Sequence, residues 1–255
     1  MLQMLLNMPA NEFLEKCRDL RSFKIHTGNI NTYSELKLQR FNTSADELSA
    51  CLQIQLSSTP LAKDFTNNST LLLCDNAHID HYDRDDLKIT MKLFLTSWAS
   101  ESHLREAVSS IKDQLAVSNV ELLIIAFPEL EIVEGEDDEK EIKRWMDKVT
   151  PLWNVLEDLV RSGDVVSVGV ADVQLAFLRA LCDTVETKPT VDHWKIDGCC
   201  VVPPELQEFA RENDIQLLTH NDPIPFPTNQ VFHSFCTLNH DSPLCSALFE
   251  PVWTV

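Results

Sequence analysis

The chain has 255 residues, 44% of them hydrophobic, and a formal net charge of −19 at pH 7. This composition supports a full hydrophobic core and argues against an intrinsically disordered chain. The strong negative charge repels phosphate backbones and anionic lipid headgroups, which argues against nucleic acids and membrane surfaces as partners.

The eight cysteines show no Cys-x-x-Cys motif and no Cys/His spacing typical of a zinc site. We therefore expect inert thiols in a reducing compartment and no metal. The first thirteen residues lack the basic start of a signal peptide, and no stretch approaches the ~18 apolar residues of a membrane span. A cytoplasmic location is expected.

The first half of the chain predicts short strands and one helix. At 45–54, Leu48, Cys51 and Leu52 recur with helical spacing. Polar and apolar residues alternate at 87–95, as in a half-buried strand. Further short strands are predicted at 22–25 and 70–74.

The second half alternates regularly between buried strands and amphipathic helices. Strands are predicted at 120–127, 165–170, 190–193 and 215–219, and helices at 102–115, 173–182 and 203–212. An acidic loop leads into a further helix that ends near Gly163, either continuous or broken at Pro151. This alternation predicts an α/β fold with a parallel sheet. The proline-rich tail at 221–255 predicts no helix.

Several segments together resemble the aldo-keto reductase superfamily. Residues 87–94 resemble its third strand, 120–128 its fourth, and Val168-Gly169-Val170-Ala171-Asp172 its fifth, while 188–215 follow the order of the sixth and seventh units. The resemblance implies a parallel (β/α)8 TIM-type barrel as a single domain over residues 1–255. The barrel is expected to be incomplete at the C-terminus, with an atypical and poorly ordered tail at 224–255.

Within that superfamily the chain is most similar to the regulatory (modifier) subunits of glutamate–cysteine ligase. The similarity lies in residues 25–29, 199–204 and 214–223, the last reading Asp-Ile-Gln-Leu-Leu-Thr-His-Asn-Asp-Pro. It implies a heterodimer with the glutamate–cysteine ligase catalytic subunit, improved use of glutamate and weaker inhibition by glutathione. It implies no cofactor in this chain. Because the similarity ends near Pro223, a truncated isoform with no activating role is an alternative.

The resemblance also allows the enzyme interpretation to be tested residue by residue. A reductase of this superfamily uses a tyrosine as proton donor, assisted by a lysine, an aspartate and a histidine. Lys92 matches the lysine, but Ala126 stands at the histidine position, and neither Tyr33 nor Tyr82 fits the tyrosine. No catalytic residue is therefore expected; an active NADPH-dependent reductase is the alternative.

The candidate contact residues each have two interpretations. Lys92 is a remnant that pairs with a carboxylate, binds an anion or extends to the rim. His220, Asn221 and Asp222 follow a strand end, where they contact a ligand at the barrel mouth or cap the following turn.

Two further features concern a partner protein. Cys199 and Cys200 form an intersubunit disulfide with a redox role or are inert thiols. The acidic loop at 134–141 meets a basic patch of the partner or is a solvated surface.

Overall fold

The computed structural model describes residues 22, 24, 27, 29–30, 33–58, 83–98, 101–196, 201–237 and 251–255. The chain divides into two compact units, residues 1–78 with 226–251 and residues 79–225 with 252–255. The expected strand at 70–74 and half of the one at 22–25 lie outside the described residues. Among the described residues, no helix has the length and apolarity needed to cross a bilayer.

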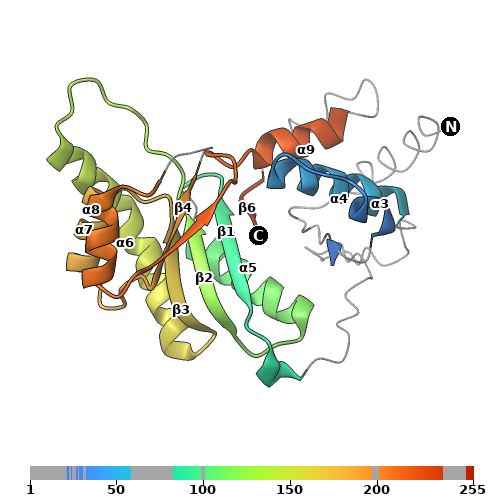
Figure 1. Ribbon diagram of the computed structural model, residues 1–255, viewed down its shortest axis with the longest axis horizontal. Coiled ribbons are helices and arrows are strands. Elements are labelled where there is room, and N and C mark those ends of the chain that lie inside the picture. Colours follow the sequence, from blue (N-terminus) through green and yellow to red (C-terminus); the bar gives the residue numbers. More distant parts are fainter. Residues whose placement is uncertain are drawn as a thin grey trace. The chain divides into compact units, whose positions relative to one another are not determined.

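The larger unit is a sheet of parallel strands connected by helices, as the sequence predicts (Figure 1). Five strands pair in chain order, and a short sixth strand joins the β1 edge antiparallel. The strands are β1 (Thr90–Leu95), β2 (Val120–Ala126), β3 (Val165–Ala171), β4 (Val191–Lys195), β5 (Gln216–His220) and β6 (Trp253–Thr254). The described strands thus form an open sheet rather than a closed eight-stranded barrel.

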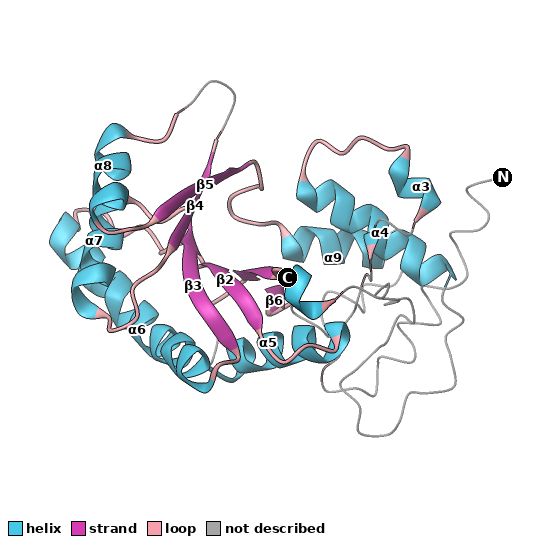
Figure 2. Ribbon diagram, turned by 60° about the horizontal axis from the view of Figure 1, so that its bottom comes forward, coloured by secondary structure: helices cyan, strands magenta, loops and turns pink. Residues whose placement is uncertain are grey.

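Four helices cover one face of this sheet (Figure 2). They are α5 (Glu101–Leu115), α6 (Asp138–Ser162), α7 (Leu175–Thr184) and α8 (Pro204–Glu212), and the short 3-10 helix η2 (Arg84–Asp86) precedes β1. Alternate strand residues face the helices, because successive side chains of a strand point to opposite sides. Leu93, Ile125 and Val170 are among them, packed with buried helix residues such as Trp153 and Leu156.

The opposite face of the sheet has its own small cluster, formed by Ile124, Ala171 and Val191. Burial on both faces is typical of parallel sheets and explains the continuous apolar runs of β2 and β3.

Helix α6 is continuous through Pro151, which settles the choice that the sequence left open. Pro151 is exposed, so its ring points away from the core, and the neighbouring Thr150 hydroxyl donates a hydrogen bond to the Met146 carbonyl at 2.7 Å. The buried face of α6 carries Trp145 and Trp153. Core packing of that face keeps the helix intact where proline removes one backbone hydrogen bond.

The smaller unit contains α3 (Ser34–Lys37), α4 (Ser44–Ser58) and α9 (Thr228–Thr237), with α4 in contact with α9. The prediction that the tail contains no helix is wrong. The prolines at 223, 225 and 227 precede α9 instead of interrupting it, and proline is tolerated at a helix start. Val231 and Phe232 of α9 are buried.

The single domain expected over residues 1–255 stays a prediction.

Gly169 of β3 generates the first testable prediction. A Cβ atom at this position would lie 2.9 Å from both the Cβ and the carbonyl oxygen of Val191 on the neighbouring strand β4. Gly169→Ala is therefore expected to lower the free energy of unfolding by about 1–3 kcal/mol, because two backbones cannot separate without disrupting their pairing. Urea denaturation measures the change.

Val166→Ala is the matched control, since Val166 lies on the same strand but is 57% exposed. Its effect is expected to stay within about 1 kcal/mol. An unchanged urea midpoint for Gly169→Ala would contradict the close approach of β3 and β4.

Candidate functional site

Charged and polar side chains gather where the parallel strands of the larger unit end. They are contributed by β1, β4, β5 and the turns after β3 and β5: Lys92, Asp172, His193, His220 and Asp222. In α/β folds, binding and catalytic groups sit at this carboxyl edge because the connecting loops converge there. We call these five residues the strand-end network.

The network begins with an ion pair between Lys92 and Asp222. The Lys92 Nζ lies 2.6 Å from the Asp222 Oδ2, and the two side chains are only 14% and 15% exposed. The same Nζ lies 5.0 Å from the centroid of the Phe94 ring. The pair joins residues 130 positions apart, so it links β1 to the segment that follows β5.

His220 connects this ion pair to a second carboxylate. Its Nε2 lies 3.0 Å from the Asp172 Oδ2 and 3.1 Å from the His193 carbonyl oxygen. Its Nδ1 accepts a hydrogen bond from the Asp222 N–H when the ring is neutral, and donates to the Asp222 Oδ2, 3.2 Å away, when protonated. Burial opposes the charged ring, but the two carboxylates outweigh it and raise the pKa of His220.

Asp172 is placed by the sharp turn that ends β3. Its φ is +58°, a left-handed conformation that Asp tolerates better than most residues. This turn lets the Asp172 N–H donate to the His193 carbonyl oxygen at 3.1 Å, while its Oδ1 accepts the Lys195 N–H at 2.7 Å. Asp172 therefore holds the ends of β3 and β4 together and presents its carboxylate to His220.

The His193 ring lies against the His220 ring, at a ring-centroid distance of 4.4 Å and an interplanar angle of 56°. Its Nε2 donates to the Thr219 carbonyl oxygen at 3.2 Å. Burial and the nearby positive charges of Lys92 and His220 lower the pKa of His193. The pKa values of the two neighbouring histidines are thus displaced in opposite directions.

Asp192 is a buried carboxyl beside this network. It is 0% exposed, and neither side-chain oxygen accepts a hydrogen bond of normal geometry. Alternation along β4 places it on the same face as Trp194, which packs against the main core. Burial, and then the charge of Asp172, raises the pKa of Asp192 to about 7. The uncharged acid is the form that this position favours.

The structure brings together some of the predicted site residues and separates others. Lys92, His220 and Asp222 belong to one network, and Asn221 between them is exposed. Ile124 is the strand partner of Lys92. Ala126 lies two residues after Ile124 and packs with the apolar cluster on the same face of the sheet. Cys199 and Cys200 lie outside the described residues, so their redox role stays a prediction.

Sequence reasoning missed Asp172, Asp192 and His193. The Gly169–Asp172 segment was noted for its family resemblance, but nothing in its composition indicated a partner 48 residues away. Asp192 and His193 lie in the strand predicted at 190–193, where an acidic residue next to a histidine was the available signal.

The charged side chains of the strand-end network are paired with one another. Lys92 and His220 face two carboxylates, Asp172 and Asp222, so each cationic or titratable nitrogen of the network has an acidic neighbour. Tyr33 belongs to the smaller unit, where its hydroxyl donates to the Thr27 carbonyl oxygen at 2.7 Å. Tyr82 lies outside the described residues.

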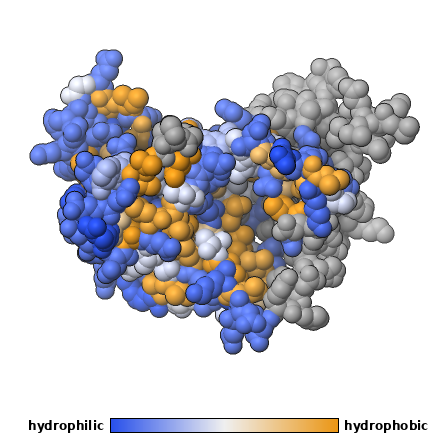
Figure 3. Space-filling model, in the orientation of Figure 1, coloured by the Kyte–Doolittle hydropathy of each residue, from blue (hydrophilic) through white to orange (hydrophobic). Residues whose placement is uncertain are grey.

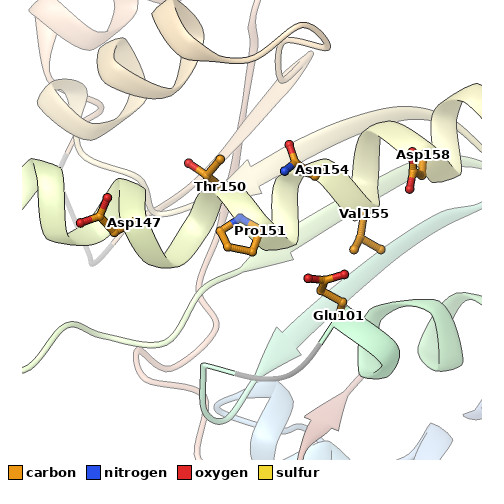
Figure 4. Close-up of a pocket in the computed structure, with 7 residues that line it drawn as sticks. All are labelled: Glu101, Asp147, Thr150, Pro151, Asn154, Val155 and Asp158. Carbon is orange, nitrogen blue, oxygen red and sulfur yellow. The ribbon is translucent and has the colours of Figure 1, made fainter.

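A separate hollow of about 410 Å³ lies between α5 and α6. In Figure 4, Glu101 at the start of α5 faces α6, which carries the other lining residues: Asp147, Thr150, Pro151, Asn154, Val155 and Asp158. Asp158 is already paired with Arg105 at 2.7 Å. None of the strand-end network lines this hollow.

The fold and the strand-end residues define a class of protein. The model of the aldo/keto reductase family matches residues 69–222, more than half of the chain. The chain therefore belongs to the aldo/keto reductase family. An aldo/keto reductase of Brucella melitensis superposes with a TM-score of 0.45 and 21% identity, over 60% of this chain and 55% of that one.

Particular relatives within the family are regulatory subunits. The chain is 32% identical to the human glutamate–cysteine ligase regulatory subunit, over 80% of this chain and 74% of the human protein. The Mus musculus regulatory subunit is also 32% identical, over 78% of this chain and 72% of its own length. A putative regulatory subunit of Schizosaccharomyces pombe is 23% identical over 55% of this chain and 54% of its own.

The Lys92–Asp222 pair generates a prediction on stability. Lys92→Met removes the cation 2.6 Å from a largely buried carboxylate, so we expect the free energy of unfolding to fall by about 3 kcal/mol. The double variant with Asp222→Asn is expected to lose less than the sum of the two single changes, because the pair is lost only once. Urea denaturation of all three variants measures the coupling.

Lys140→Met is the matched control, since its pair with Asp137 is exposed at 71% and 58%. Such surface pairs contribute about 0–1 kcal/mol. If the Lys92 and Asp222 changes had strictly additive effects on the free energy of unfolding, an interaction between these two side chains would be ruled out.

Asp192 generates a prediction on pH dependence. Its ordinary pKa of 3.8 is raised to about 7 by folding, so the unfolded chain releases this proton at lower pH than the folded one. The free energy of unfolding should therefore fall as pH rises from 4 to 7, by at most about 4 kcal/mol for three pKa units. Asp192→Asn keeps the shape and removes this slope.

Stability curves of the two proteins between pH 4 and 8 measure the effect. The advantage of the Asp192→Asn variant should be small at pH 4, grow towards pH 7 and then level off. Parallel curves across this range would refute a neutral Asp192.

Proposed function

We propose that this chain is a non-catalytic regulatory subunit that binds the catalytic subunit of a glutamate–cysteine ligase in the cytoplasm and activates it. Two lines of support converge on this role. The relatives that share most of its length carry the name of that regulatory subunit. The lysine at the reductase position is held in an internal ion pair.

The ion pair is the observation that carries the proposal. A reductase of this family needs its lysine beside a proton-donating tyrosine, so that the positive charge lowers the pKa of the phenol. Here the Lys92 Nζ lies 2.6 Å from the Asp222 carboxylate, and Ala126, which has no titratable group, occupies the histidine position. Without the histidine the set of reductase side chains is incomplete, and the Lys92–Asp222 pair by itself supplies no proton-donating phenol.

Activation by a bound subunit requires a preference between conformations. The regulatory subunit raises activity only if it binds the active conformation of the catalytic subunit more tightly than the inactive one. Glutamate, cysteine, ATP and magnesium would all bind to the catalytic subunit. The charge of −19 favours a partner with a basic docking surface and speeds their encounter.

The test is the glutamate dependence of the purified catalytic subunit at a fixed glutathione concentration, with and without the full chain. We expect the apparent KM for glutamate to fall several-fold and the inhibition by glutathione to weaken. The same chain after heat denaturation is the control for nonspecific protein effects. An unchanged KM in the presence of a folded, bound chain would overturn the activating role.

The same preparation tests the alternative of an active reductase. Titration with NADPH, followed by its fluorescence, is expected to give no saturable binding. Saturable binding accompanied by reduction of a carbonyl substrate would favour the reductase instead, and would make the Lys92–Asp222 pair a resting arrangement.

A further inference from the structure

The loop between β2 and α6 exposes two large apolar residues. Ile132 is 96% exposed and Val133 is 51% exposed. Leu130, only two residues earlier, packs against the main core. Leu130 of this loop therefore faces the core, whereas Ile132 and Val133 face solvent.

A single arginine holds this exposed segment in place. The Arg144 Nη2 donates to the Glu131 carbonyl oxygen at 3.0 Å, just before Ile132. The same guanidinium donates to both carboxylate oxygens of Glu136, at 3.2 and 2.6 Å. The Arg144 and Glu136 side chains are 27% and 14% exposed, so this clamp is largely shielded from water. Arg144 of α6 thus fixes the loop on both sides of the apolar pair.

The backbone between the two clamp points forms a tight turn. The Glu136 N–H donates to the Val133 carbonyl oxygen at 3.2 Å, and Gly135 adopts a φ of +77°. A left-handed third residue is the mark of a type II turn, in which glycine is favoured. Asp137 then caps α6 by accepting the Lys140 N–H at 2.9 Å. We call residues 131–136 the loop tip.

Acidic side chains surround the loop tip. Glu129, Glu131, Glu134, Asp138 and Glu139 are all exposed. Of the neighbouring cations, Arg144 and Lys140 are paired with Glu136 and Asp137, and Lys143 is exposed. The surroundings of the apolar pair are therefore strongly negative.

The loop tip lies on the carboxyl edge of the sheet together with other exposed apolar residues. Val201 (76% exposed) and Ile224 (44%) follow β4 and β5 along the chain, as the loop tip follows β2. Figure 3 shows apolar surface among the hydrophilic side chains of the larger unit. Loops at this edge of an α/β sheet are where recognition residues are carried.

We propose that Ile132 and Val133 are the apolar anchor by which this chain docks on its partner. The anchor enters an apolar pocket whose rim carries lysine and arginine side chains, matching the acidic surroundings of the loop tip. This inference rests on the proposed function, so the partner is the glutamate–cysteine ligase catalytic subunit. A preformed tip loses little conformational freedom on binding, which favours affinity.

The apolar and acidic parts of this surface have separable effects. A buried apolar anchor slows dissociation, because its pocket must be rehydrated when the complex separates. Exposed acids around it speed association and make the rate sensitive to salt.

The test compares the binding of purified catalytic subunit to the full chain and to three variants, by surface plasmon resonance. Ile132→Ser with Val133→Ser is expected to raise the Kd at least tenfold, mainly through faster dissociation. Leu38→Ser is the matched control, since Leu38 is 92% exposed in the smaller unit, and its Kd should stay unchanged. Arg144→Met keeps the anchor but removes the clamp, and its Kd should rise by a smaller factor.

The outcomes separate this inference from the proposed function. If the unaltered chain binds and the Ile132/Val133 variant binds equally well, the anchor is wrong and the regulatory role stands. If Leu38→Ser weakens binding as much as the anchor variant does, the anchor is likewise overturned. If the unaltered chain does not bind the catalytic subunit, the proposed function fails and the anchor with it. Circular dichroism confirms that each variant is folded.

Discussion

The ion pair between Lys92 and Asp222 is the constraint on which the carboxyl edge of the sheet depends. It links β1 to the segment after β5, the two ends of the row of parallel strands. Asp222 in turn orients His220, and His220 binds the carboxylate of Asp172, which holds β3 against β4. Removal of Lys92 takes the cation from a largely buried carboxylate, and removal of Asp222 takes the anion from a largely buried lysine, changes that cost about 3–5 kcal/mol in comparable sites.

The site of Lys92 explains why the ion pair forms. A cation in a partly buried site is stable only beside an anion, and Asp222 supplies one at hydrogen-bond distance. The pKa values of the two neighbouring histidines shift in opposite directions. The pKa of His220 is raised because the ring lies between carboxylates, whereas the pKa of His193 is lowered by burial and by the positive charges of Lys92 and His220. The charges of the network are thus balanced internally.

The same edge of the sheet combines a rigid base with exposed loops. Parallel strands place their carboxyl ends side by side, and the strand-end network keeps them there. The loop after β2 can then expose Ile132 and Val133 without relying on the rest of the loop for support, because Arg144 of the packed helix α6 holds it.

The sequence by itself determined the family and the alternating strands and helices of the larger unit from β1 to β5, but it missed α9 and β6. Helical spacing placed α4, and continuous apolar runs placed β2 and β3, because these patterns are local and follow from the periods of helix and strand. The order of the segments around Lys92, Val168–Asp172 and His220 carried the family resemblance.

Only the tertiary structure decided which side chains meet. Asp172 reaches His220 because β4 lies between their strands in a parallel register that aligns His193 with Leu218, and no local pattern encodes that register. The neutral state of Asp192 depends on burial by distant segments, as does the continuity of α6 through Pro151. Contacts between residues far apart in the chain are set by packing, and packing is a property of the folded molecule as a whole.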